Sequence, residues 1–201
     1  MGSPVAELAA IVATAVALAS SVPQLRRIIV VGDVAGVSLS FATIGMATEL
    51  AWLTYAVHGR LWSAVPEAIG MAAANAVMAH GMVRAGAARR RAVGAAMAWL
   101  VVMGLAVQLG GIAALGLVLG PAFAVQTAPS IWTAYRTHAP SGVATATWAL
   151  VGVEAVLWGV YGLAHRDVGI MAFAVVGSLS TAAILGRKFS TRHRQVALAL
   201  A

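Results

Sequence analysis

Three glutamates and two tryptophans stand inside long apolar stretches of this sequence. Glu49 precedes Trp52 by three residues, Glu154 precedes Trp158 by four, and Glu67 lies in the next apolar stretch after Trp52. A carboxyl group in hydrocarbon is costly in its charged form, so each glutamate is a candidate proton acceptor on a solute path. A tryptophan ring suits the C–H face of a sugar or, through its quadrupole, a cation. These residues predict solute binding with proton coupling.

Each of these residues also has a simpler interpretation. The tryptophans could form an aromatic belt at a membrane interface, and the glutamates could meet water near helix ends or pair with Arg60. Tyr55 and Tyr161 follow the two tryptophans by three residues and therefore share their helix faces. We include both tyrosines in the candidate solute site.

The apolar stretches that carry these residues are long enough to cross a membrane. The chain has 201 residues, of which 61% are hydrophobic and 9% charged, with a mean hydropathy of +0.91. A soluble domain carries about 25% charged residues, so this chain has too few to cover a water-exposed surface. A spanning helix needs about 20 apolar residues. Seven runs qualify: 6–25, 38–57, 62–83, 92–109, 112–135, 143–164 and 168–186. The fold prediction is an all-α membrane protein with seven transmembrane helices.

The distribution of Lys and Arg predicts the orientation. With the N-terminus outside, eleven of the 13 basic residues fall in cytoplasmic segments, and only Arg60 and Arg166 fall outside. Membrane topology thus accounts for the net charge of +7, and we do not expect nucleic acid as a partner. The N-terminal end of the first run has Glu7 and no Lys or Arg, and the arginines come after the run, which is the wrong flank for a signal peptide. The Ala- and Arg-rich composition favours a bacterial inner membrane.

An internal repeat joins the first part of the chain to the second. Adding 106 to the residue number carries Trp52 onto Trp158, Tyr55 onto Tyr161 and Arg60 onto Arg166 without a gap. The same shift relates three further pairs: Pro23 and Pro129, Gly36 and Gly142, and Val37 and Val143. Three helices thus form a unit that occurs twice. One helix between the copies returns the chain across the membrane, so the copies are parallel and related by an axis along the membrane normal.

The chain divides on this basis into four parts. These are a first triple-helix bundle (1–87), a linker helix (88–110) with Gly110 and Gly111 turning into the next helix, a second bundle (111–189) and a basic cytoplasmic tail (190–201).

The 3+1+3 pattern resembles the SWEET and PQ-loop superfamily of small-solute transporters, which includes the half-size SemiSWEETs. The resemblance covers nearly the whole chain. Its motifs are Pro23-Gln24, Gly36-Val37-Ser38, Trp52-x-x-Tyr55 and, in the second copy, Pro129, Gly142-Val143 and Trp158-x-x-Tyr161-Gly162.

The resemblance implies alternating access around a site between the two bundles. It supports Pro23 and Pro129 as hinges, where a proline removes a helix hydrogen bond, although a static kink is the alternative. It also implies a substrate-binding asparagine in the third helix of each unit. This chain has Glu67 and, after a one-residue slip, Ala174 at those places, which leaves Asn75 as a substitute.

Five functions remain to be compared. By resemblance, the default is a transporter of a small polar solute such as a sugar. The alternatives are a proton-coupled carrier of an amino acid or cationic solute, and a non-transporting sorting receptor. A retinal protein is excluded because the only lysine, Lys188, lies past the last run. Catalytic motifs and clustered metal ligands are absent from the sequence, so we predict neither an enzyme nor a cofactor. The expected partners are the solute and membrane lipid; a monomer is competent, and a homo-oligomer is compatible with the sequence.

Overall fold

The computed structural model describes residues 3–33, 38–136 and 145–199, and these residues contain helices and no strand. Side chains 129, 130, 132–134 and 192–199 are not described. The elements are α1 (Pro4–Arg26), the π-helical turn η1 (Arg27–Val31), α2 (Leu39–His58), the 3-10 turn η2 (Trp62–Ala64), α3 (Val65–Arg84), α4 (Arg89–Arg136), α5 (Thr145–His165) and α6 (Val168–Ala199). The all-α prediction is confirmed.

Polar side chains fix where several helices begin. Ser3 accepts a hydrogen bond from the Ala6 amide at the start of α1, and Ser38 accepts one from Phe41 at the start of α2. Asp167 does the same for Ile170 at the start of α6, at 2.8 Å. Each side chain satisfies an amide that has no partner within its helix. The boundaries therefore follow from short polar residues that directly precede apolar runs.

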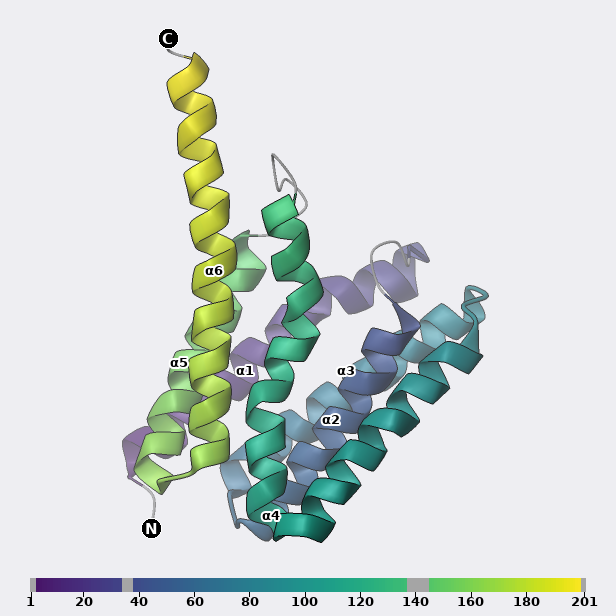
Figure 1. Cartoon of the computed structure of the whole chain (residues 1–201), viewed down its shortest axis with the longest axis vertical. Coiled ribbons are helices and arrows are strands. Elements are labelled where there is room, and N and C mark those ends of the chain that lie inside the picture. The colour runs from purple at the N-terminus through teal and green to yellow at the C-terminus, as the bar shows by residue number, and fades with distance from the viewer. Residues whose placement is uncertain (1–2, 34–37, 137–144, 200–201) are drawn as a thin grey trace.

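The element α4 is a helical hairpin rather than one straight helix. Gly111 has φ 68° and ψ −161° inside its 48 residues, a conformation that is essentially restricted to glycine. Figure 1 shows the chain reversing direction there, at the end of the molecule where the N-terminus lies. The predicted turn between the fourth and fifth apolar runs is confirmed. We refer to the part before Gly111 as the first half of α4 and to the part after it as the second half.

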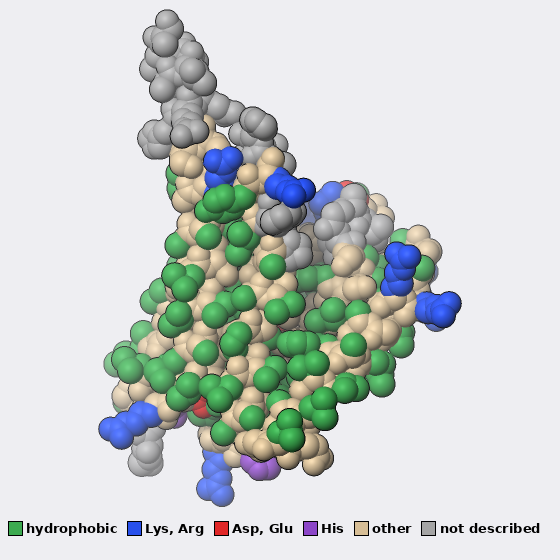
Figure 2. Space-filling model, viewed as in Figure 1, with side chains coloured by type: hydrophobic (Ala, Val, Ile, Leu, Met, Phe, Trp, Pro, Cys, Tyr) green, Lys and Arg blue, Asp and Glu red, His purple; other side chains and the backbone are tan. Residues whose placement is uncertain are grey.

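The helices have the length and composition of membrane spans. Within the described residues, four helical stretches are long and apolar enough to cross a membrane: Pro4–Val31, Arg89–Ala128, Thr145–His165 and Val168–Thr191. α2 and α3 fall outside this group and carry Glu49, Glu67 and Asn75. Figure 2 shows hydrophobic side chains over the broad middle of one face, with Lys and Arg at its ends. The chain is an integral membrane protein of the all-α class.

The two copies of the repeat end their second helix in the same way. Arg60 (φ 56°) and Arg166 (φ 54°) are the two non-glycine residues of positive φ in the described part of the chain, and they are 106 residues apart. The next amide in each copy reaches back five residues at 2.8 Å, from Leu61 to Ala56 and from Asp167 to Gly162. This is the hydrogen bond of a Schellman cap. The repeat therefore extends from sequence to backbone geometry.

Helix packing follows the repeat as well. The third helix of the first copy, α3, packs against α1 and α2, and α6 packs against α4 and α5. Between the copies, α1 packs against α5 and α2 packs against α4. The contacts of α4 with α6 come from its second half, where Gly120 approaches Ala172. Each packing relation thus has a counterpart in the other copy.

Some boundaries differ from the sequence prediction. The last helix continues to Ala199, beyond the predicted end at 186, because the basic segment after it has no helix-breaking residue. Pro23 lies within the last turns of α1 and does not end the helix, which continues into η1 as far as Gly32 (φ 73°). Pro129 falls within α4, but its side chain is outside the described residues. Gly36, Val37, Gly142 and Val143 also lie outside them.

Candidate functional site

A cavity of about 720 Å³ lies where the two copies of the repeat meet. Its walls come from α1, α2, α3, the second half of α4, α5 and α6, whereas the first half of α4 supplies no lining residue among those described. The polar and aromatic lining residues are Ser20, Ser21, Gln24, Ser38, Phe41, Glu49, Trp52, Glu67, Asn75, Phe123, Gln126, Thr147, Glu154, Trp158 and Phe173. All six helices of the two predicted units therefore face one space.

The two repeated tryptophans lie on opposite walls and reach across to the other copy. The indole N–H of Trp158, which is 4% exposed, donates to both carboxylate oxygens of Glu67 at 3.1 Å. Trp52 meets Phe173 edge to face, with ring centroids 6.0 Å apart. Glu67 and Phe173 are themselves 106 residues apart. The contacts of the two tryptophans thus pair Glu67 with Phe173. Ala174 is instead buried against Gly159, so the repeat continues here without a one-residue slip.

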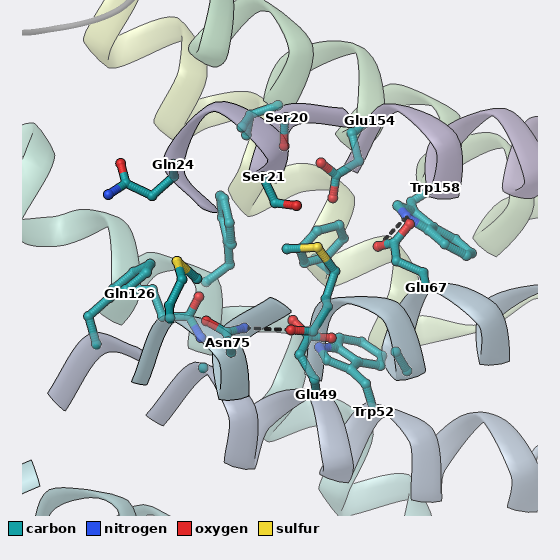
Figure 3. A pocket seen from close by; sticks show the side chains of 18 of the residues that line it. Ser20, Ser21, Gln24, Glu49, Trp52, Glu67, Asn75, Gln126, Glu154 and Trp158 are labelled. Atoms are coloured by element: carbon teal, nitrogen blue, oxygen red, sulfur yellow. Dashed lines mark hydrogen bonds between the residues drawn. The ribbon is translucent and has the colours of Figure 1, made fainter. Parts of the chain in front are cut away.

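Three carboxylates enter the cavity from three helices. Figure 3 shows Glu49 of α2, Glu67 of α3 and Glu154 of α5 directed toward the same space. Glu67 is held by Trp158, whereas Glu49 and Glu154 have no hydrogen-bond or ion-pair partner among the described residues. The site therefore carries a concentration of negative charge or of exchangeable protons.

The neutral polar residues of the cavity have their donors largely committed to the protein. Ser20 and Ser21 donate to the carbonyls of Ala17 and Leu18 at 2.7 and 2.8 Å. Asn75, which is 5% exposed, donates from Nδ2 to the Met71 carbonyl at 3.0 Å. Both serine hydroxyls and one of the two Nδ2 hydrogens of Asn75 are used in this way, so the serines offer oxygen acceptors to a solute and Asn75 offers its carbonyl oxygen and one N–H.

The amides of two glutamines complete the polar lining. Gln126 donates from Nε2 to Thr48 at 3.4 Å, so its carbonyl oxygen is left for the cavity. Nε2 of Gln24 is buried without a hydrogen-bond partner among the described residues. Gln24 and Gln126 come from the first helix of each copy. The 106-residue shift carries Gln24 to position 130, which is four residues, or about one helical turn, from Gln126.

One end of the cavity is closed by hydrogen bonds between the two copies. We call this the Arg60 end, where α2 meets α3 and α5 meets α6, and we call the opposite end of the helices the Arg26 end. The Tyr55 hydroxyl donates to Asp167, with both carboxylate oxygens at 2.9 Å. Asp167 also caps α6 through Ile170. The bond therefore ties α2 of the first copy to the start of α6 in the second.

A second tie at the Arg60 end involves Glu7 in the first turn of α1. Glu7 accepts a hydrogen bond from the Ser63 hydroxyl and lies 3.0 Å from Nε2 of His165, at the end of α5. The imidazole ring of His165 lies 4.2 Å from the ring centroid of Tyr161. Glu7 thus joins the first copy to the second, as the bond between Tyr55 and Asp167 does.

A packed apolar layer lies between these ties and the cavity. Its largest fully buried side chains are Leu119 (0% exposed) and Tyr161 (1% exposed), and Leu61 and Ile170 belong to the same cluster. From this layer the cavity extends toward the Arg26 end, where Gln24 and Thr147 line it. Along α5 the lining runs from Trp158 to Thr147, which is eleven residues or about 17 Å. The cavity therefore reaches far toward one end and stops before the other.

The structure brings most of the predicted site residues together. Six predicted residues line the cavity: Glu49, Trp52, Glu67, Asn75, Glu154 and Trp158. Tyr55 and Tyr161 lie in the layer next to it and contact the tryptophans edge to face, with centroids 5.6 and 5.4 Å apart. Pro23 is exposed beside the lining residue Gln24.

Sequence reasoning missed the residues that close the Arg60 end. In the sequence, Glu7 stands out only as a charge at the N-terminal end of the first run, and His165 and Asp167 match no functional motif. A usable signal was present, because both acids lie within one turn of a helix start, at the same end of the predicted topology. Phe123 and Phe173 were missed because an apolar side chain in an apolar run carries no distinguishing pattern.

Fold and site together define an all-α integral membrane protein with a largely apolar cavity that carries three carboxyl groups between two structurally repeated parts. Comparison of the chain with protein-family models, with curated proteins and with solved structures gives no match.

Proposed function

We propose that the chain is a transporter that moves a small polar solute by alternating access between two three-helix bundles. The bundles are α1 to α3 and the second half of α4 with α5 and α6, and the first half of α4 is the linker helix. Counting the two halves of α4 separately gives seven spans. The orientation proposed is N-terminus outside and C-terminus cytoplasmic, in a bacterial inner membrane, which makes the Arg60 end the outer end.

One observation carries the proposal: a single cavity at the junction of the repeats that extends toward one end and is closed at the other. The closing contacts, Tyr55 to Asp167 and Glu7 to His165, join different copies of the repeat. A relative movement of the copies would break both together and admit solute from the outer end. This is the arrangement expected of a carrier whose repeats rock around a midplane site.

The resemblance to SWEET and PQ-loop proteins makes a sugar the default solute. A proton-coupled carrier of an amino acid or cationic solute is the second candidate, and it is favoured by the three cavity carboxylates. A sorting receptor that binds without transport is the third. Pro23 and Pro129 remain the proposed hinges.

Uptake by the purified chain in proteoliposomes tests the proposal. Labelled sugars, amino acids and amines are offered at two pH values to the wild type and to the variants Trp52→Ala and Trp158→Ala. We expect saturable uptake that both variants reduce at least tenfold while remaining folded in detergent. Specific binding without uptake of any solute would favour the receptor, and unchanged uptake by both variants would remove the tryptophans from the site.

A further inference from the structure

The charges of the chain are distributed in a way that bears on the solute. Of its six acidic residues, three line the cavity, two close the Arg60 end and one, Asp33, pairs with Arg27. No Lys, Arg or His lines the cavity among the described residues. Burying carboxylates without a compensating charge is expensive, so each must take up a proton or meet a cation, and a cationic solute is the counter-ion open to the ionised carboxylates because the described lining holds no basic side chain.

Metal ions are not the cation that this lining fits. Within the described residues no group of three acidic or imidazole side chains is arranged to hold one metal ion. The carboxylates come from three separate helices and face a cavity of about 720 Å³, which is far larger than an ion. The space is that of an organic molecule.

Neutral groups of the lining favour a solute that donates hydrogen bonds. The hydroxyl hydrogens of Ser20 and Ser21 are used within α1, and the carbonyl oxygen of the nearly buried Asn75 receives no donor from the described residues. An ammonium group carries three donors and no acceptor, so it matches such a surface. Some donors are left over in the lining, but all of them are neutral and give no charge compensation. They are the indole N–H of Trp52, the amide of Gln24, one amide hydrogen each of Asn75 and Gln126, and the hydroxyls of Ser38 and Thr147.

The cavity is also asymmetric under the repeat. Where one copy presents Glu67 to Trp158, the other presents Phe173 to Trp52. Phe173 packs against Phe123, with ring centroids 5.3 Å apart, so the wall around Trp52 is a cluster of three rings. The wall around Trp52 therefore suits an apolar group, including a ring, with the carboxyl group of Glu49 beside it.

We infer that the solute is an organic amine that carries an apolar group and no carboxylate. This inference rests on the proposed function and names its substrate class. A sugar would leave three carboxylates without a counter-charge. An amino acid would bring a fourth carboxylate into a lining that offers it no cation. An amphipathic amine places its ammonium beside the carboxylates and its apolar group against Trp52 and Phe173.

Matched pairs of compounds that differ only by a carboxylate test the inference. Tyramine and tyrosine form one pair, agmatine and arginine another, and ethanolamine and glucose serve as small or neutral probes. Binding to the full chain in detergent is followed by quenching of tryptophan fluorescence at neutral pH. We expect tyramine to bind at least tenfold more tightly than tyrosine, and more tightly than agmatine or ethanolamine.

Glutamine variants, which keep the shape of glutamate without its charge, test whether the carboxylates bind the amine. Glu49→Gln, Glu67→Gln and Glu154→Gln should each raise the Kd of tyramine at least fivefold, and Asp33→Asn, outside the cavity, should leave it unchanged. If one glutamine variant fails to fold, the other two carry the test. Tyrosine or glucose binding as tightly as tyramine overturns the inference, and so does the absence of tyramine binding.

Uptake measurements separate this inference from the proposed function. Tyramine that binds through the carboxylates but is never taken up leaves the inference standing and refutes transport of that solute. Uptake of a sugar by a chain that does not bind tyramine refutes the inference and retains the transporter.

Discussion

Tyr55→Phe removes one hydroxyl from the contact that closes the Arg60 end. The hydroxyl bonds to Asp167 at 2.9 Å, while the ring of Tyr55 packs against Trp52 at 5.6 Å. Phenylalanine keeps the ring contact, and Asp167 keeps its cap on Ile170 at 2.8 Å. The substitution therefore removes a bond between the repeats without removing the packing around it.

The size of the effect follows from the kind of hydrogen bond. A hydrogen bond to a charged acceptor contributes about 1.5–3 kcal/mol. Because every 1.4 kcal/mol is about a factor of ten in an equilibrium constant, loss of this bond favours opening of the Arg60 end about 10- to 150-fold. The tie between Glu7 and His165 remains, so the closed form should still be populated.

The chain has no cysteine, which allows a clean accessibility assay. Ala68 is 4% exposed and lines the cavity below the packed layer, so Ala68→Cys places one thiol there. A membrane-impermeant thiol reagent is added to the N-terminal side of intact cells, and the labelling rate is followed. We expect Tyr55→Phe to raise this rate at least tenfold.

Tyr161→Phe is the matched control, because the repeat makes Tyr161 the counterpart of Tyr55. Its hydroxyl has no hydrogen-bond partner among the described residues, so its removal should change the labelling rate less than twofold. Equal labelling rates in the Tyr55→Phe and wild-type backgrounds would show that the contact with Asp167 does not hold the end closed.

Three further predictions concern other contacts. His165→Phe should raise the labelling rate of Ala68→Cys severalfold, because it removes the 3.0 Å contact with Glu7 and keeps a ring beside Tyr161. Gly111→Ala should lower stability by about 1–3 kcal/mol, measured as a fall in thermal midpoint, because Gly111 has φ 68° and ψ −161°. Gly45→Ala should weaken solute binding about tenfold, because its Cβ would lie 2.8 Å from Oδ1 of Asn75.

Each of these predictions has a control in the same chain. Gly104→Ala adds a Cβ that meets no atom within 4 Å, so the thermal midpoint should not fall. Gly152→Ala brings a Cβ to 2.9 Å from Thr181, outside the cavity lining, so it should reduce stability and leave solute affinity unchanged. An unchanged labelling rate in the His165→Phe background, or equal losses of affinity at Gly45 and Gly152, would contradict the reasoning.

The apolar runs and the repeat made much of this architecture predictable. Lipid demands about 20 apolar residues per span, which located the helices, and two adjacent glycines located the turn in α4. Polar residues inside apolar runs are costly, which is why Glu49, Glu67 and Glu154 could be selected before their shared cavity was known. These features are encoded locally in the chain.

Contacts between the copies could not be derived in the same way. The residues around Tyr55 in the sequence do not indicate that its partner is Asp167, 112 residues away, because this contact depends on how the bundles meet. The assignment of Glu67 to Ala174 shows the same limit. Sequence motifs aligned the third helices by a glycine, whereas the packing pairs Glu67 with Phe173 through the tryptophans that they touch.

The fixed position of Asp167 also affects how fast the Arg60 end can close again. Its carboxylate is fixed by the Ile170 amide of its own helix, independently of Tyr55. The acceptor therefore keeps one rotamer after the tyrosine leaves, and re-forming the bond costs little side-chain entropy on that side. Only a tyrosine with two side-chain torsions must find its place again. The return to the closed form is then limited by how fast the helices move, and not by a conformational search among side chains.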